Sequence, residues 1–191
     1  MDRDLERILD FAIELDRLKA VTRRTKPVGL DRHENSAEHS WQICVLAQLL
    51  ARHAREPVDI VRVVEMLLVH DIPEIEAGDQ VIYERSPADR AVTEREAARR
   101  IFGLLPGAQA SWCLARWEEF EARQSREAAY AYAMDRLMPV LQNLRDNGQS
   151  WREHKVPLEK VLTVNAAIGE VFPEVWEDVR ERIVRAFGAG A

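Results

Sequence analysis

The chain has 191 residues, a length that fits one domain with a substantial buried core. Its hydrophobic fraction of 47% and charged fraction of 31% are typical of a globular protein, and no apolar run approaches membrane-spanning length. The net charge of −6, from 27 basic and 33 acidic residues, argues against a broad nucleic-acid-binding surface. A small anionic ligand is compatible with this balance, because local arginines can serve a pocket in an acidic protein.

Both cysteines, Cys44 and Cys113, lie in apolar helical patterns without the spacing of a disulfide framework or a zinc ribbon. We expect both to be reduced and to pack in the core. The N-terminus opens into an amphipathic helix and lacks the charged-then-apolar order of a signal peptide. These features predict a cytoplasmic protein that does not associate with membranes.

Hydrophobic periodicity predicts a helix over residues 3–20, followed by a basic loop over residues 21–35. In this loop we expect Arg23, Lys26 and Arg32 to be solvated side chains. The alternative interpretation is a loop that folds over a pocket and clamps a phosphate group.

The next helix is predicted over residues 36–54, with Ser36 as its N-cap. His39 lies in the first turn, where the positive end of the helix dipole disfavours a protonated imidazole. Two interpretations are open for His39: a surface histidine near a helix start, or a neutral imidazole bound to a metal.

An apolar segment that starts after Asp59 brings His70 and Asp71 to its own end. Its length favours a helix over a strand, with Asp59 as the N-cap, and Pro73 predicts a kink or a new helical start. If the helix continues, Glu74 shares a face with the histidine and the aspartate. A His-Asp pair at the end of a buried element costs free energy unless it is paired or binds a metal, although such a pair also ends ordinary helices.

The second half of the chain predicts only helices and turns, without a repeat or a linker. Asp135 interrupts an apolar helical stripe, and its spacing fits an outward-pointing acid and a buried, cation-held acid equally well. A turn over residues 146–150 is expected before the last pair of helices. The predicted helices cover residues 87–105, 108–123, 125–145, 158–170 and 173–187.

With these elements placed, the sequence resembles the HD-domain metal-dependent phosphohydrolases, in the branch that includes the bacterial 5′-deoxynucleotidases. The family pattern is a histidine on an early helix, an adjacent His-Asp on the next and a lone aspartate on a later helix, here His39, His70, Asp71 and Asp135. The match runs from about residue 5 to about residue 145. It includes the longer blocks Glu-Asn-x-x-Glu-His-Ser and His-Asp-x-x-Glu-x-x-x-Gly-Asp.

The resemblance implies an all-α fold, a single domain over residues 1–191 with about six to eight helices. The C-terminal helices over residues 158–187 are expected to pack on the HD core, and the protein is expected to form a homodimer. The implied activity is metal-dependent hydrolysis of a phosphomonoester, with a small-molecule nucleoside or deoxynucleoside 5′-monophosphate as substrate.

The same resemblance assigns His39, His70, Asp71 and Asp135 as ligands of one divalent transition metal ion. Two imidazoles and two carboxylates suit Mn, Co, Fe, Ni or Zn and do not select among them. By the same implication, Glu74 is the catalytic residue that orients a metal-bound water or carries its proton.

Further roles are expected at the rim of the site. Arg24 would grip the phosphate, and Asp79 would accept a hydrogen bond from the sugar. His33 and His154 are second-tier candidates, for which an ordinary polar role at the rim is the simpler interpretation.

Two departures from the family pattern bear on the substrate. Relatives with nucleotidase activity carry Arg-Trp or Gly-Trp in the loop where this chain has Arg24-Thr25, and the chain has an additional Gly-x-Ser-Trp-x-x-His block ending at His154. Hydrolysis of another phosphate ester or anhydride, such as a nucleoside triphosphate or an alarmone, therefore stays open. So does a non-catalytic regulatory module, which would hold its metal in a closed four-ligand site.

Overall fold

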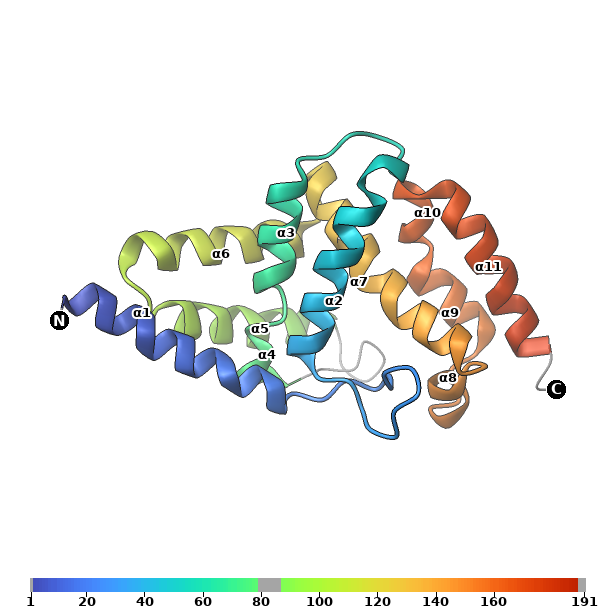
Figure 1. The fold of residues 1–191 in the computed structure, drawn as a ribbon, viewed down its shortest axis with the longest axis horizontal. Coiled ribbons are helices and arrows are strands. Elements are labelled where there is room, and N and C mark those ends of the chain that lie inside the picture. Colours follow the sequence, from blue (N-terminus) through green and yellow to red (C-terminus); the bar gives the residue numbers. More distant parts are fainter. Residues whose placement is uncertain (1, 79–86, 189–191) are drawn as a thin grey trace.

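The computed structural model describes residues 2–78 and 87–188, and the side chains of residues 87–91 lie outside the description. The described chain is all-α, as predicted, with eight α-helices of at least eight residues and three shorter ones. Figure 1 shows an elongated molecule, with α1, α5 and α6 at one end, α2, α3 and α7 in the middle and α9 to α11 at the other end. The helices are α1 (Arg3–Glu14), α2 (Ser36–Leu50), α3 (Ile60–Val69), α4 (Glu74–Ala77), α5 (Pro87–Phe102), α6 (Gly107–Ala122), α7 (Arg126–Arg145), α8 (Gln149–Glu153), α9 (Leu158–Asn165), α10 (Ala167–Val171) and α11 (Pro173–Gly188), with 3-10 turns at Leu15–Ala20 and Ala51–His53.

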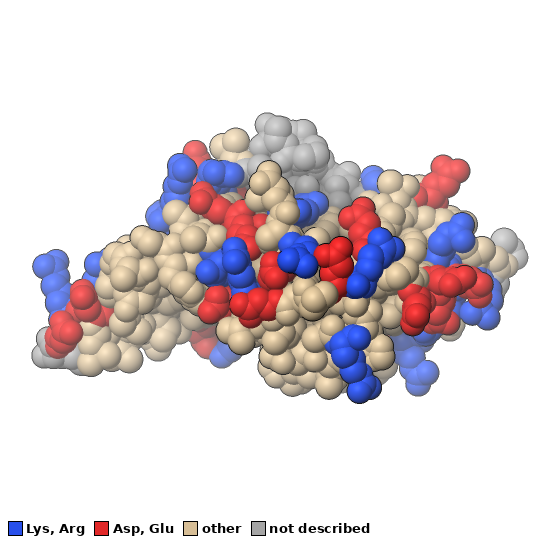
Figure 2. All heavy atoms as spheres, turned by 90° about the horizontal axis from the view of Figure 1, so that it is seen from above, with Lys and Arg blue, Asp and Glu red and all other residues tan. Residues whose placement is uncertain are grey.

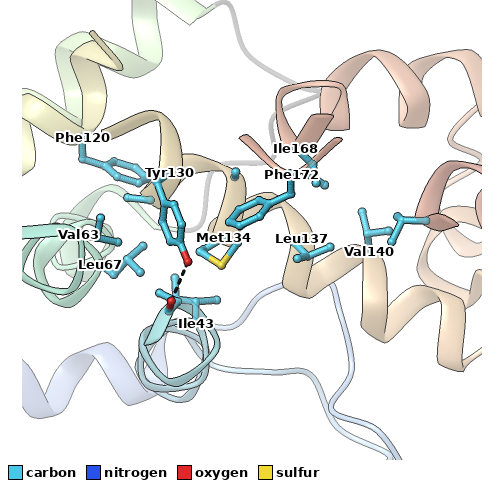
Figure 3. Close-up of a cluster of buried hydrophobic side chains, with 14 of the residues drawn as sticks. Ile43, Val63, Leu67, Phe120, Tyr130, Met134, Leu137, Val140, Ile168 and Phe172 are labelled. Carbon is cyan, nitrogen blue, oxygen red and sulfur yellow. Dashed lines mark hydrogen bonds between the residues drawn. The ribbon is translucent and has the colours of Figure 1, made fainter. Parts of the chain in front are cut away.

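Helix α7 is the centre of the packing, because it contacts α2, α3 and α6 on one side and α8 to α11 on the other. Its side chains form the middle of the larger hydrophobic core (Figure 3). Within this core the hydroxyl of Tyr130 donates a hydrogen bond to the carbonyl of Ala47 at 2.7 Å, which satisfies a buried polar group. The ring of Tyr130 also meets Phe172 edge-on, with 5.0 Å between centroids, so α2, α7 and the C-terminal helices share one core.

A second, smaller core lies where α1, α5 and α6 meet the end of α3. Helix α3 contributes Met66 and Leu67 to the larger core, whereas Val69 and Ile72 pack in the smaller one. The pair that begins at His70 therefore lies at the junction between the two cores, where α3 ends.

The start of α2 differs from the prediction by one residue. Asn35, not Ser36, is the N-cap, because the Asn35 side chain accepts a hydrogen bond from the Glu38 backbone N–H at 2.9 Å. The Glu38 carboxylate in turn accepts from the Asn35 N–H at 2.8 Å, which completes a capping box. The hydroxyl of Ser36 is thereby available for another contact, and it donates to Glu74 at 2.7 Å.

The segment from Asp59 to Glu74 agrees with the prediction. It is helical rather than extended, and the Asp59 carboxylate accepts from the backbone N–H groups of Val61 and Arg62 at 3.0 and 3.3 Å. The helix ends before a turn that contains Pro73, and the new helix α4 begins at Glu74.

The C-terminal region differs from the prediction in two places. The expected turn over residues 146–150 gives way early to α8, and the helix expected over residues 158–170 is split between α9 and α10 at Ala166. Asn147 and Gly148 have φ angles of 52° and 75°, and this left-handed pair turns the chain back from α7 into α8.

The cysteines agree with the expectation that they are reduced, and the surface of the described residues has two further features. None of the helices in the described ranges is long and apolar enough to cross a membrane. Cys44 is half-buried and Cys113 buried, and both are free. Figure 2 shows acidic and basic side chains interspersed on one face, without a continuous basic track for a nucleic-acid backbone on that face.

Candidate metal centre

Four polar side chains converge in the interior from three helices. His39 comes from α2, His70 and Asp71 from the end of α3, and Asp135 from the middle of α7, with exposed fractions of 0%, 6%, 7% and 4%. The distance from His39 Nε2 to Asp135 Oδ1 is 3.0 Å, and from His70 Nε2 to Asp71 Oδ1 also 3.0 Å. One ligand atom from each of His39, His70 and Asp135 lies within 4.8 Å of the others. The outward-pointing interpretation of Asp135 and the surface interpretation of His39 are therefore wrong.

The tautomer of His70 follows from its surroundings. Its Nδ1 lies 2.8 Å from the carbonyl oxygen of Leu67, which can only accept, so Nδ1 carries a hydrogen. In the neutral ring Nε2 then has a lone pair, and this atom lies 3.0 Å from an oxygen of Asp71 and 3.8 Å from one of Asp135. Such a lone pair among carboxylate oxygens is stabilised by a proton or by a metal ion.

The residues present fit a divalent ion. His70 Nε2 is a buried side-chain atom that makes no hydrogen bond among the described residues, although carboxylate oxygens of Asp71 and Asp135 lie 3.0 and 3.8 Å from it. His39 Nε2 faces the same carboxylates, 3.0 Å from Asp135 Oδ1, while His39 Nδ1 faces Glu34. Buried polar atoms of this kind are rare unless they bind an ion or water. Together with the oxygens of Asp71 and Asp135, the imidazoles form a mixed nitrogen and oxygen ligand set for a transition metal.

The electrostatics keep both carboxylates ionised at neutral pH. Burial raises the pKa of Asp71, but His70 and Arg23 outweigh it and hold that pKa at about 2. Burial likewise opposes ionisation of Asp135, whose pKa is nevertheless held well below its usual value by Arg136 and His39. Burial lowers the pKa of His70, and the neighbouring carboxylates more than reverse this, raising it to about 10. The cluster therefore attracts cations.

Arg23 takes part in this cluster, and the prediction that it is solvated is wrong. Its side chain is 11% exposed, with Nη1 2.8 Å from Asp71 Oδ2 and Nη2 3.5 Å from Asp135 Oδ1. The physical reason is an antiparallel bridge between Thr22 and Asn35, which holds the loop against the start of α2. Lys26 and Arg32 instead form the ion pairs Lys26–Asp31 and Arg32–Glu38 near the surface, in agreement with the prediction.

Glu34 is a buried residue of the site that the sequence analysis did not identify. It is 1% exposed, and its carboxylate accepts hydrogen bonds from Gln142 Nε2 at 2.5 Å and from Thr25 Oγ1 at 3.2 Å. Its Oε2 lies 3.4 Å from His39 Nδ1 and 3.7 Å from Arg23 Nε. A carboxylate behind a metal-facing imidazole orients the ring. The available signal was its position at the start of the Glu-Asn-x-x-Glu-His-Ser block.

The other predicted site residues are not among the four side chains that converge at the centre. Glu74 begins α4 and accepts a hydrogen bond from Ser36, one helical turn before His39. Arg24 is half-buried and lines a pocket beside the cluster. His33 is exposed, and Asp79 lies outside the described residues.

The pocket beside the cluster has a volume of about 130 Å³. Arg23 and Arg136 line it and also contact Asp135, so the pocket adjoins the cluster. His154, for which the sequence favoured an ordinary polar role at the rim of the site, is one of the residues that line this pocket. The lining residues are Arg23, Arg24, Thr25, Arg136, Pro139, Val140, Asn143, Ser150, Trp151, His154, Val156, Val164 and Asn165.

The fold is that of a known family. The family model described as "HD domain" matches residues 15–176, and the chain belongs to this HD-domain family. The resemblance inferred from the sequence is thereby confirmed, together with the all-α class.

Individual relatives agree with this assignment. The chain is 41% identical to the crystal structure of a predicted metal-dependent phosphohydrolase from Magnetospirillum magnetotacticum, with a TM-score of 0.92 over 98% of this chain and 94% of that one. It is 29% identical to the 5′-deoxynucleotidases HDDC2 of Mus musculus and Homo sapiens, over 60% and 71% of this chain. The matched segments span 56% and 66% of those two relatives. A Pyrococcus horikoshii structure that is 18% identical shares the fold, with a TM-score of 0.67.

Proposed function

We propose that this HD-domain protein is a metal-dependent phosphohydrolase that cleaves a nucleoside or deoxynucleoside 5′-monophosphate into nucleoside and phosphate. The observation that carries the proposal is the convergence of His39, His70, Asp71 and Asp135, in which the buried Nε2 of His70 makes no hydrogen bond within the described chain. These four residues would hold one divalent ion. When bound, such an ion supplies Lewis-acid polarisation of a phosphate oxygen and a water of lowered pKa. The relatives named above support the reaction class and the nucleotide substrate.

The charge balance of the cluster supports a phosphate substrate. Three carboxylates (Glu34, Asp71 and Asp135) face two guanidinium groups (Arg23 and Arg136), which leaves one negative charge when the imidazoles are neutral. A divalent ion would reverse this to one positive charge. The complete site would therefore attract and stabilise a phosphate group as negative charge develops on it.

Two residues would act on the substrate directly. Glu74, anchored to the first turn of α2 through Ser36, would accept the proton of the attacking water. Arg24, at the pocket wall, would bind the phosphate through charge-assisted hydrogen bonds. Asp79, which lies outside the described residues, would accept a hydrogen bond from a hydroxyl group of the sugar.

The pocket supports an enzyme over a regulatory module with a structural metal. A structural site is closed by four protein ligands, and it needs no adjoining cavity. Here a pocket adjoins the cluster through Arg23 and Arg136, which gives a substrate room beside the metal ligands.

The test is a phosphatase panel on chelator-treated protein to which Mn, Co, Fe, Ni or Zn is added back. We expect metal-dependent phosphate release from nucleoside 5′-monophosphates. Pyrophosphate release from triphosphates alone would support the anhydride alternative and contradict the proposed substrate. A metal-loaded protein that releases neither product from the panel would contradict the enzyme and favour the regulatory module.

A further inference from the structure

We propose that the pocket beside the metal centre binds the heterocyclic ring of the leaving nucleoside, and that His154 is a specificity-determining residue in it. This inference rests on the proposed function and extends it to the part of the substrate that leaves with the ester oxygen. The residues that carry it lie in α7, α8, α9, the segment at residues 154–157 that joins α8 to α9, and the loop at residues 23–25.

The position of the pocket relative to the cluster gives the first argument. Arg23 Nη1 lies 2.8 Å from Asp71 Oδ2, and Arg136 Nη2 lies 2.5 Å from Asp135 Oδ2, while both arginines also line the pocket. A phosphate held at the cluster would therefore have these guanidiniums beside it. Its ester-linked group would extend past them into the pocket.

The size and lining of the pocket give the second argument. A volume of about 130 Å³ is less than half of the roughly 300 Å³ at which sites for whole drug-sized ligands begin, so the pocket suits one ring system. Among the described residues that line it, none is acidic, which disfavours a cationic occupant. Its apolar part can stack against or cover a flat ring, and consists of Pro139, Val140, Trp151, Val156 and Val164.

The α8 wall of the pocket is firmly attached to the core. Trp151 is 7% exposed and stacks on Phe187, with 5.6 Å between ring centroids and 25° between ring planes. The Ser150 N–H donates to Asn143 Oδ1 at 3.1 Å, which ties α8 to α7. Gly148 has a φ of 75°, and a Cβ there would lie 3.1 Å from the Trp151 ring, so glycine permits this approach. Because these side chains are already held in place, little conformational entropy is lost when a ring binds against them.

The polar atoms of the wall indicate what kind of ring is preferred. His154 Nδ1 lies 2.9 Å from the Ser150 carbonyl oxygen, so Nδ1 carries a hydrogen and Nε2 of the neutral ring is an acceptor. Asn165 Nδ2 donates to the Val161 carbonyl at 2.8 Å, which leaves Asn165 Oδ1 as an acceptor among the described contacts. Two acceptors suit a heterocycle that presents N–H or amino groups, as nucleobases do.

The first experiment compares two substrates that share the reacting phosphate and the sugar. The kcat/KM values of 2′-deoxyadenosine 5′-monophosphate and 2-deoxyribose 5-phosphate are measured for wild type, for Val164→Trp, which fills the pocket, and for the matched control Val184→Trp on the exposed face of α11. We expect Val164→Trp to lower the ratio of nucleotide to sugar phosphate by about tenfold or more. The control should leave this ratio at the wild-type value. An unchanged ratio in a folded Val164→Trp would overturn the pocket while leaving the proposed function in place.

The second variant, His154→Ala, removes the acceptor without filling the pocket, and its melting temperature shows that it folds. We expect the same ratio to fall about threefold to tenfold, the effect of one lost hydrogen bond. Equal losses on both substrates would contradict a role for His154 in recognition of the ring.

A binding measurement separates failure of the pocket from failure of the proposed function. Saturation-transfer NMR with 2′-deoxyadenosine, which has no phosphate, is carried out on wild type and on both Val→Trp variants. We expect binding to wild type and to Val184→Trp, with a strong loss in Val164→Trp. If wild type binds the nucleoside in this way but cleaves no phosphomonoester, the pocket stands and the proposed function fails. Absence of nucleoside binding to wild type, or equal binding to Val164→Trp, would overturn the pocket.

Discussion

The candidate metal centre, called the cluster below, and the pocket beside it share two arginines, but different kinds of side chain line them. The cluster is buried and ionic, and its three carboxylates exceed its two guanidiniums by one negative charge when the imidazoles are neutral. The pocket is lined by five apolar side chains, by three arginines and by polar side chains of α7, α8, α9 and the residues next to them, and no acidic side chain is among its described lining residues.

This difference determines how each region responds to mutation. In a buried ionic cluster, removal of one charge leaves its partners uncompensated, so each group affects all the others. In an apolar pocket, removal of one side chain loses mainly its own contact. We therefore expect large, cooperative effects on metal binding in the cluster and small, substrate-dependent effects at the pocket.

The largest effect is expected for Asp71→Ala. Asp71 is buried between His70 and Arg23, and its loss removes one predicted ligand and leaves the guanidinium of Arg23 without its closest carboxylate. Activity should be abolished, as it should be by chelation of wild type, and bound metal should fall far below one equivalent. The control is Asp178→Ala, an exposed acid of α11 that pairs with Arg182. A purified Asp71→Ala that binds a full equivalent of metal with unchanged affinity would contradict the ligand assignment.

The four predicted ligands were assigned through the resemblance to the HD-domain family, and the sequence itself indicated only the helical context of each. His39 follows a capping signal, His70 and Asp71 end an apolar run, and Asp135 interrupts an apolar stripe. Local periodicity thus gave their order and helical context. It left Asp135 undecided between inside and outside, because only the packing of α7 against α2 and α3 settles which way that side chain points.

Other residues depend on contacts that no local pattern encodes. Whether Arg23 or Arg24 points at the cluster is set by the bridge between Thr22 and Asn35, which pairs opposite ends of a loop. The pocket likewise joins Thr25 to His154, far apart in the sequence. These positions depend on tertiary contacts, which the sequence pattern does not show. The prediction that Arg23 is solvated was wrong for this reason.

The second prediction tests whether the cluster has a proton acceptor as well as ligands. Glu74→Gln keeps an oxygen that can accept from Ser36 Oγ, but an amide cannot accept a proton from water. We expect kcat to fall by about 10²–10⁴-fold, the usual range for loss of a general acid–base group. Metal content and melting temperature, measured on the same preparation, should stay near wild type.

The matched control is Glu76→Gln in the same short helix, whose carboxylate pairs with Arg100. Near-normal kcat in Glu74→Gln would refute the catalytic role. Loss of metal from this variant would instead place Glu74 among the ligands.

A smaller effect on the cluster is expected for Glu34→Gln. The carboxylate lies 3.4 Å from His39 Nδ1, and a neutral amide would support the imidazole less strongly as a ligand. We expect metal affinity to weaken by about 10–100-fold, the usual consequence of changing such an outer-sphere partner. Competition with a chelating indicator measures the affinity, and the absorption spectrum of the Co-loaded protein reports the ligand field. Glu177→Gln, an exposed position on α11, is the control. Unchanged affinity together with a lowered melting temperature would leave Glu34 a purely structural role.

The smallest effect is expected for Arg24→Ala, where the cluster meets the pocket. Arg24 lines the pocket, and a guanidinium can hold a phosphate but cannot ligate a cation. Its removal should raise KM for a nucleoside 5′-monophosphate by about tenfold, the loss of one charge-assisted contact, and change kcat far less. Metal content should equal that of wild type, in contrast to the cluster variants. Arg180→Ala, on the exposed surface of α11, controls for loss of a positive charge. If metal occupancy falls while KM stays constant, Arg24 supports the cluster rather than the substrate, and the boundary between the two regions lies beyond it.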